Sequence, residues 1–324
     1  MNRQELGPRE FSRVTAGKGP VATGKVREAS PVLAEGVERF IFADVFSRSG
    51  LSAREREMLT CAVLAAIGGA ENQLGVHVPA ALECGADPEE MIQLCEQITP
   101  YCGFPRALNA LRAVRAVLEE RGLPLPLATR EVTLPDGAGT LVTDVGEGGD
   151  GFVMLHPPEL DRQAWREVIR ALPEGTRVVA PDLRGAGAAA AAPPATDMGQ
   201  LVADVGAVMD AVGLERAQVV TAGATATLGA ELAAGLVGRV TRVHAFVADS
   251  PAADAAPGVE ALVGWFTPQQ LAADGWAVRY ARDRLRRQDP EGTAALRRVL
   301  AGGRGLSEGP HPLADPATLA AALT

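Results

Sequence analysis

Helix start and stop signals between Leu51 and Asn109 constrain the fold of this chain more than any other feature. Ser52 and Glu55 form a predicted capping box, and an apolar run follows it as far as Gly68. Similar signals recur along the stretch: an N-cap followed by proline, acidic first turns and terminal glycines. They predict three further helices, at 71–84, 88–101 and 105–121. The stretch is therefore expected to form an all-α unit.

Short motifs in this stretch carry a family resemblance. In order, they are Arg-Glu-Met-Leu at 56–59, Glu71-x-Gln73-Leu74-x-x-His77, Gly85 followed by Glu89-Glu90, and Tyr101-x-Gly103-x-Pro105. Together with the segment 40–50, they resemble the carboxymuconolactone decarboxylase family over residues 30–121. The resemblance implies a helical decarboxylase that needs neither metal nor organic cofactor, because the substrate's conjugated lactone carbonyl accepts the electrons released.

The resemblance and the helical spacing together select candidate site residues. Gln73 and His77 lie four residues apart, so they face the same groove. Glu57 comes from the preceding predicted helix and is expected to orient His77 or to relay a proton. The candidates in this domain are catalytic His77, Glu57 and Glu71, with Gln73, Cys102 and Arg106 expected to bind the substrate.

Most of these candidates also have a structural interpretation. A histidine on a helix often only packs, and Glu57 could form an ordinary ion pair with Arg54 or Arg56. Glu71 could simply be a first-turn charge that stabilises the helix dipole. Arg106 lies at a predicted helix N-terminus, which by itself favours a bound carboxylate.

Redox chemistry is not expected from the cysteines. Cys61, Cys84, Cys95 and Cys102 have no C-x-x-C spacing and are predicted to be free, reduced thiols. Related alkylhydroperoxidases carry a cysteine pair just before their histidine, where this chain has Ala70 and Gln73. A thiol peroxidase is therefore excluded.

Composition excludes further classes of function. The net charge of −9 and the absence of a basic patch argue against nucleic-acid binding. No apolar run is long enough to span a membrane, and the first residues lack a signal peptide. We therefore expect a cytoplasmic protein without membrane association. Its 36 glycines and alanine-rich tracts indicate a GC-rich bacterial genome.

The length of 324 residues favours two domains, and the hydrophobic period changes after residue 122. We expect a flexible N-terminus at 1–25 and a helical domain at 26–122, which begins with one helix at 26–48. The proline-punctuated segment 123–129 is the predicted linker. A second domain is expected at 130–324.

The second domain alternates strands and helices. Predicted strands lie at 130–134, 140–145, 151–156, 177–180, 217–222 and 243–248, and predicted helices at 163–172, 197–212 and 226–236. This alternation predicts a mostly parallel sheet covered on both faces. Residues 130–285 resemble an α/β-hydrolase, and Trp265–Pro268 resembles the cap of 3-oxoadipate enol-lactonases. The fold class is therefore an all-α domain followed by an incomplete α/β-hydrolase-like domain.

The hydrolase-like domain is expected to lack its nucleophile. A hydrolase serine lies on a strained turn between a strand and a helix. The corresponding turn here is Gly223, Ala224 and Thr225, with Ala224 at the nucleophile position. A methyl group cannot attack a carbonyl, so covalent catalysis there is excluded. Asp249 and His311 stand near the positions of the acid and the histidine, but the chain after 287 is too short for the remaining strands.

Two histidines of this domain receive separate expectations. His156 is expected to line a pocket and bind substrate, whereas His244 is expected to be a satisfied core histidine. A hydrolase that has lost its nucleophile can still retain a pocket under its cap.

These observations predict a cofactor-independent lyase resembling 4-carboxymuconolactone decarboxylase, with a non-hydrolytic second domain. Its substrate would be a carboxylated lactone or a related β/γ-keto-type acid. Fusions of this decarboxylase to the enol-lactonase occur in aromatic catabolism, but in the opposite order. A biosynthetic decarboxylase or cyclase acting on a larger natural-product acid is therefore an alternative. A non-catalytic binding or scaffold protein is an alternative of another class. The resemblance also implies a homo-oligomer, a trimer or hexamer formed through the helical domain.

Overall fold

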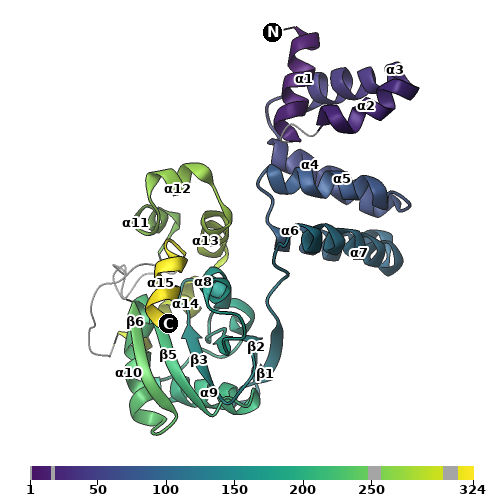
Figure 1. The fold of residues 1–324 in the computed structure, drawn as a ribbon. Helices are drawn as coiled ribbons and strands as arrows, with labels where there is room; N and C mark the ends of the chain where they lie inside the picture. Colours follow the sequence, from purple (N-terminus) through teal and green to yellow (C-terminus); the bar gives the residue numbers. More distant parts are fainter. Residues whose placement is uncertain (1, 16–18, 247–256, 302–312) are drawn as a thin grey trace. The chain divides into compact units, whose positions relative to one another are not determined.

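The computed structural model describes residues 2–15, 19–246, 257–301 and 313–324 (Figure 1). Contacts divide the chain into two units, Met1–Pro126 and Leu127–Thr324. The division falls inside the segment 123–129, where prolines restrict the backbone of their neighbours. Along the described segments, no helix has both the length and the apolarity needed to cross a membrane.

The core of the first unit consists of the helices that the capping signals predict. They are α4 (Ala53–Ile67), α5 (Glu71–Glu83), α6 (Pro88–Cys102) and α7 (Phe104–Glu120). The predicted capping box between Ser52 and Glu55 forms, and the predicted N-cap Asp87 forms a second one with Glu90. Gly68 follows α4 with a φ of 71°, a conformation that suits glycine. The four helices share one buried cluster, centred on side chains such as Met91 and Leu118.

The N-terminal part differs from the sequence-based expectation. Residues 1–25 were expected to be mobile, but they contain α1 (Arg3–Val14) and the start of α2 (Gly19–Ala29). The expectation of mobility was wrong for α1, because Phe11 and Val14 are buried against the π-helix η1 (Gly36–Phe46). Side-chain burial therefore orders a segment whose composition is mostly polar.

The single helix expected at 26–48 is also wrong. The chain forms α2, a short α3 (Pro31–Glu35) and then η1. Ser30 adopts an extended conformation with a φ of −151° and caps α3 through its hydroxyl. The ring of Pro31 disfavours a helical residue before it, so the helix must break at Ser30.

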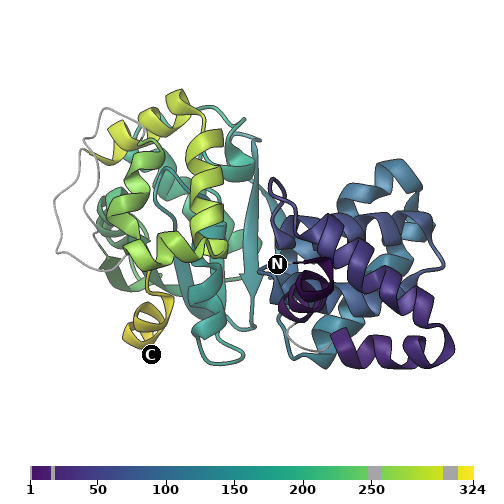
Figure 2. The same cartoon turned by 90° about the horizontal axis from the view of Figure 1, so that it is seen from above.

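The second unit contains a sheet of six strands within the described residues (Figures 1 and 2). The strands are β1 (Thr129–Thr133), β2 (Gly139–Val145), β3 (Asp150–Leu155), β4 (Val178–Pro181), β5 (Arg216–Ala222) and β6 (Val240–Phe246). Their order is β1-β2-β4-β3-β5-β6, with β1 and β2 antiparallel to their neighbours and the rest parallel. The predicted mostly parallel sheet is confirmed.

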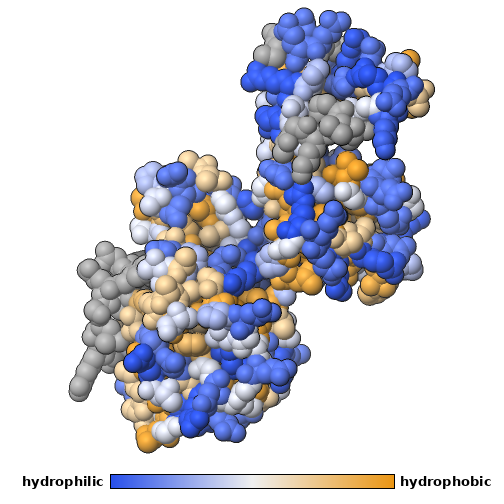
Figure 3. Space-filling view, viewed as in Figure 1, coloured by the Kyte–Doolittle hydropathy of each residue, from blue (hydrophilic) through white to orange (hydrophobic). Residues whose placement is uncertain are grey.

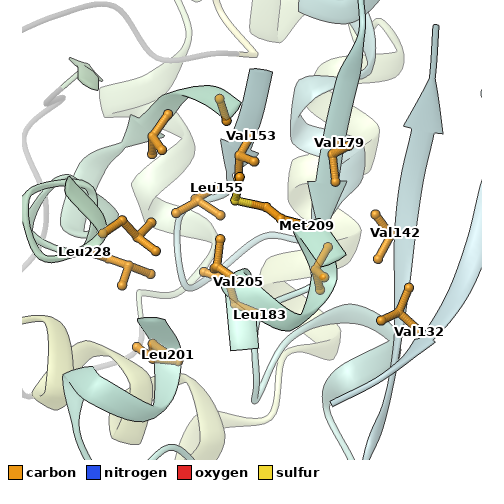
Figure 4. Packing of buried hydrophobic residues seen from close by; sticks show 14 of the residues in the cluster. Val132, Val142, Val153, Leu155, Val179, Leu183, Leu201, Val205, Met209 and Leu228 are labelled. Carbon is orange, nitrogen blue, oxygen red and sulfur yellow. The ribbon is translucent and has the colours of Figure 1, made fainter. Parts of the chain in front are cut away.

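Helices cover both faces of this sheet. They include α8 (Arg166–Ala171), α9 (Met198–Ala211), α10 (Ala226–Gly235), α14 (Pro290–Leu300) and α15 (Pro316–Leu323). Val153 and Leu155 pack with α9, α10 and α14 on one face (Figure 4). Phe152 and Met154 pack with α8 and α15 on the other face. This alternation is the two-residue period of a strand buried on both sides.

A cap of short helices lies over the carboxyl ends of the strands. It comprises η5 (Val259–Ala261), α11 (Leu262–Trp265), α12 (Pro268–Ala273) and α13 (Trp276–Arg287). The guanidinium of Arg166 stacks on the ring of Trp276, 3.3 Å from its centroid. The hydroxyl of Tyr280 donates to Asp161 Oδ1 at 2.6 Å. These contacts fix the cap to the loop after β3.

Candidate functional site

The helical unit brings two predicted catalytic residues into direct contact. His77 on α5 lies with Nδ1 2.9 Å from Oε2 of Glu57 on α4. The Glu57 side chain is 1% exposed, whereas that of His77 is 33% exposed. The carboxylate therefore lies inside the helical core, and the imidazole joins it to the surface.

This arrangement fixes the direction of the imidazole. When Nδ1–H donates to the carboxylate, Nε2 is the nitrogen available to exchange a proton with a ligand. Among the described residues, no other side chain or backbone group forms a hydrogen bond with the His77 ring. A carboxylate held in this way also stabilises the imidazolium after it has taken up a proton.

The cysteines nearest to Glu57 are not nucleophiles. Burial, reinforced by the charge of Glu57, raises the pKa of Cys61 to about 12 and that of Cys84 to about 11. Both thiols therefore remain protonated at neutral pH and are unreactive. All four cysteines are free.

The other candidates of this unit form no hydrogen bond with the pair. Gln73 and Arg106 are exposed, and Glu71 and Cys102 are partly buried. No hydrogen bond joins these four residues to His77 or Glu57 within the described residues. Arg106 lies across the C-terminus of α4, where a Cβ added to Gly68 would be 3.3 Å from its Nε. Among the candidates that the structure describes, a hydrogen bond therefore joins the histidine and the buried glutamate alone.

The expectation that His156 binds a substrate is wrong. Its side chain is fully buried, Nδ1 donates to the carbonyl of Pro157 at 2.7 Å, and Nε2 accepts from the N–H of Leu183 at 2.9 Å. Burial lowers the pKa of His156 and keeps the ring neutral. Both ring nitrogens are used by the backbone, so this histidine is structural. His244 is partly buried and bonds to Gln218 Oε1 at 2.7 Å.

The turn after β5 contains the three residues expected there. Gly223 has a φ of 60°, and the 3-10 turn η4 (Gly223–Thr225) leads into α10. Ala224 is the second residue of this turn, directly after the residue with positive φ. The positive φ falls on Gly223, because only glycine adopts this φ freely.

Thr225 is also unable to act as a nucleophile. Its hydroxyl is buried, donates to the carbonyl of Ala222 at 2.8 Å, and accepts the N–H of the same residue at 3.2 Å. The hydroxyl therefore lies beneath the turn and stabilises it. Asp249 and His311 lie outside the described residues.

Helix α14 packs against the core next to this turn. Leu296 and Leu300 of α14 join the core cluster that also contacts Ala224. Arg297 forms a buried ion pair with Glu159, with Nη1 3.1 Å from Oε2. The neighbouring cavity, lined by Glu159 and Thr293 among others, measures about 60 Å³. A water molecule takes about 30 Å³ and ligand pockets measure about 300–1,000 Å³, so this cavity is too small for a substrate.

An open depression of about 540 Å³ lies elsewhere in the second unit, beside the β1–β2 hairpin. It is lined by Glu131, Asp136 and small residues of 137–139 and 188–193. None of the predicted site residues lies in it. Among the described residues, no three His, Cys, Asp or Glu side chains come together in a way that could hold a metal ion.

Comparison with known proteins agrees with this division of the chain. Residues 31–116 match the carboxymuconolactone decarboxylase family, and residues 151–275 match the alpha/beta hydrolase fold. The 4-carboxymuconolactone decarboxylase of Acinetobacter baylyi is 31% identical over 87 residues, which are 27% of this chain and 64% of that protein. The chain thus spans less than two thirds of this curated relative.

Solved structures similar to this chain include two hydrolase-fold proteins. The enol-lactonase from Burkholderia xenovorans is 22% identical over 54% of this chain and 74% of its own, with a TM-score of 0.44. A hydrolase from Pseudomonas aeruginosa is 22% identical over 54% of this chain and 73% of its own, with a TM-score of 0.46.

Proposed function

We propose that this chain, which joins a carboxymuconolactone decarboxylase family domain to an alpha/beta hydrolase domain, is a cofactor-independent carboxy-lyase. Its substrate class is a carboxylated lactone or a related β/γ-keto-type acid. The observation that supports the proposal is the pairing of partly exposed His77 with buried Glu57 at 2.9 Å. Both residues lie inside the segment 31–116 that matches the family.

The proposed reaction breaks the bond between the carboxylate and the ring carbon. The electron pair of that bond moves into the conjugated carbonyl, carbon dioxide leaves, and a dienolate forms. His77 then donates the proton from Nε2 to carbon, and solvent returns a proton to the ring. Glu57 stabilises the imidazolium before the transfer and holds Nδ1–H throughout.

Binding of the substrate carboxylate is assigned to the surface around the pair. Gln73 lies one turn before His77 on the same face of α5, and Arg106 lies where α4 ends. A guanidinium and an amide are suitable donors for a carboxylate. Glu71, in the first turn of α5, is proposed to assist catalysis without contacting the reacting carbon. The larger acid of a biosynthetic decarboxylase or cyclase would use the same donors.

A second proposal concerns the α/β unit, which we infer to be a binding or scaffold module without hydrolytic activity. It is supported by the glycine at the elbow, the buried hydroxyl of Thr225 and the packing of α14. If the whole chain were such a module, the surface around His77 would bind a ligand without turnover.

The direct test is release of carbon dioxide from carboxylated γ-lactones by the full-length chain. Release that depends on His77 supports the lyase. Saturable binding of the same acids without release, measured by calorimetry, would identify a binding protein instead.

Hydrolysis of short aryl esters should remain at the background rate for the wild-type chain and for Ala224→Ser and Gly223→Ser. Within the described part of the chain, His156 cannot act as the general base for a serine at either position, because both of its ring nitrogens are used in backbone hydrogen bonds. Initial rates with 4-nitrophenyl acetate check this expectation. Wild-type turnover that phenylmethylsulfonyl fluoride abolishes would contradict it.

An exposed apolar surface on the helical unit supports the proposal of a homo-oligomer (Figure 3). Leu59, Val63 and Ile67 are 53%, 60% and 58% exposed and lie four residues apart along α4. Phe104 and Leu108 of α7 are 70% and 54% exposed. Apolar groups gathered in this way mark an interaction surface. We propose that further copies of the chain cover it, as the resemblance to ring-forming family members implies.

Val63→Glu should therefore convert the oligomer to a monomer without unfolding it, because the new charge would be buried at the interface. Light scattering coupled to size exclusion measures the mass, and circular dichroism reports the fold. Val237→Glu is the matched control, since Val237 is 82% exposed in the other unit. A wild-type chain that is already monomeric, or a Val63→Glu oligomer of unchanged mass, would rule out this surface.

A further inference from the structure

The end of α1 packs on the elements that carry the His77–Glu57 pair. Phe11 and Val14 are 5% and 0% exposed, and their cluster includes Ala53 and Cys84. Ala53 lies one turn before Glu57 on α4, and Cys84 ends α5. The Cys84 Sγ donates to the carbonyl of Val14 at 3.7 Å. Helix α1 therefore contacts both helices of the pair.

The same cysteine also lies near the carboxylate. The charge of Glu57 is, after burial, the largest influence that raises the pKa of the Cys84 thiol to about 11. Ala53 lies one turn before Glu57 on α4, and Cys84 lies two turns after His77, so α1 packs on residues that share helical faces with the pair. The Glu57 side chain is 1% exposed. Since α1 lies outside residues 31–116, this packing comes from outside the segment that matches the family.

We propose that α1 is a positioning element for the His77–Glu57 pair, closing the Cys84 side of the site and keeping water from the carboxylate. This inference rests on the proposed roles of His77 and Glu57. A carboxylate shielded from water attracts its partner more strongly than a hydrated one. The shielding therefore holds the ring with Nδ1–H on Glu57 and Nε2 free for the substrate. Phe11 and Val14 are positioning residues, because neither reaches the reacting atoms.

One glycine allows this element to be displaced without touching the pair. Gly7 lies at the contact between α1 and η1, where an added Cβ would overlap the backbone carbonyl of Glu38. Gly7→Leu must therefore move α1 away from η1. Leucine also has a higher helix propensity than glycine, so α1 can remain helical. Ser12→Leu is the matched control, because Ser12 is exposed on the same helix.

The first measurement is alkylation of Cys84 by iodoacetamide in the full-length chain, followed by mass spectrometry of the cysteine peptides. Gly7→Leu should accelerate it about tenfold or more, because an uncovered thiol ionises more readily. Cys95 is the internal control, since it is buried in the four-helix core and bonds to the carbonyl of Met91. Its rate should not change. An unchanged rate at Cys84 would overturn the inference.

The second measurement is the tautomer of His77, read from its ¹⁵N chemical shifts in the neutral ring. The wild type and Ser12→Leu should show one tautomer with Nδ1–H, and Gly7→Leu should show a mixture. Val14→Ala, a milder change beside Cys84, should fall between them. A single tautomer in Gly7→Leu with an exposed Cys84 would show that α1 covers the pair without positioning it. Because neither readout needs turnover, failure of the proposed lyase activity is detected separately by the carbon dioxide assay.

Discussion

Replacing His77 with alanine should lower turnover of a confirmed substrate by about 10²–10⁴-fold, the usual cost of removing a general acid. The proton that ends the proposed reaction comes from Nε2, and no other imidazole is placed to supply it in the described helical unit. The effect should appear in kcat, because the substrate carboxylate would still bind. Steady-state carbon dioxide release measures it.

Stability and assembly provide the control for this variant. The His77 side chain is one third exposed, so its removal leaves no large cavity, and the melting temperature and oligomer mass should change little. Asn72→Ala, an exposed substitution on the same helix, should keep wild-type turnover. Full turnover by His77→Ala would refute the role of His77 as the proton donor and show that other residues carry the reaction.

Arg184→Met should destabilise the second unit by about 3–5 kcal/mol, the usual cost of removing one partner of a buried ion pair. The Arg184 side chain is 1% exposed. Its Nε lies 2.5 Å from Asp204 Oδ2, and its Nη1 lies 2.6 Å from Asp136 Oδ2 and 3.3 Å from the carbonyl of Pro193. Methionine fills the space but leaves the carboxylate of Asp204 without its partner. Chemical denaturation measures the loss.

An exposed ion pair provides the matched comparison. Arg216 and Asp150 are 58% and 62% exposed, so Arg216→Met should change stability little. Acid dependence gives a second readout. The hydrogen bond from Arg184 lowers the pKa of Asp136 to about 2. The ion pair between Arg184 and Asp136 therefore stabilises the fold fully above the ordinary aspartate pKa, and this stabilisation is lost as the pH falls towards 2. Arg184→Met should weaken that dependence. Equal losses of unfolding free energy in Arg184→Met and Arg216→Met would contradict a special contribution of the buried Arg184 ion pairs.

The second unit has a sheet and helices of the alpha/beta hydrolase kind, with a glycine of positive φ directly after β5. Helix α14 packs against the core that contacts the neighbouring Ala224, through Leu296 and Leu300. The ion pair between Glu159 and Arg297 lies in the interior and holds α14 to the loop after β3. The turn after β5 therefore offers no side chain able to act as a nucleophile at Gly223 or Ala224.

Local signals in the sequence determined most of the architecture. The capping boxes at Ser52 and Asp87 placed two helices, and alternating apolar residues placed the strands to within a few residues. The four-residue spacing of Gln73 and His77 and the motif around Glu57 predicted the candidate pair. These features depend on neighbours along the chain, and for this reason periodicity and capping chemistry were sufficient.

Only the tertiary structure decided which candidates meet. Glu57 and His77 are 20 residues apart and form a hydrogen bond. In contrast, Nε2 of His156 accepts a hydrogen bond from a backbone N–H 27 residues away and is not available to a ligand. Glu159 accepts a hydrogen bond from Arg297, 138 residues further along the chain, in the interior of the second unit. The sequence supplies the chemical groups, but burial and hydrogen-bond partners depend on how distant elements pack. The burial of the Glu57 carboxylate and the availability of Nε2 of His77 to a ligand are therefore properties of the folded chain.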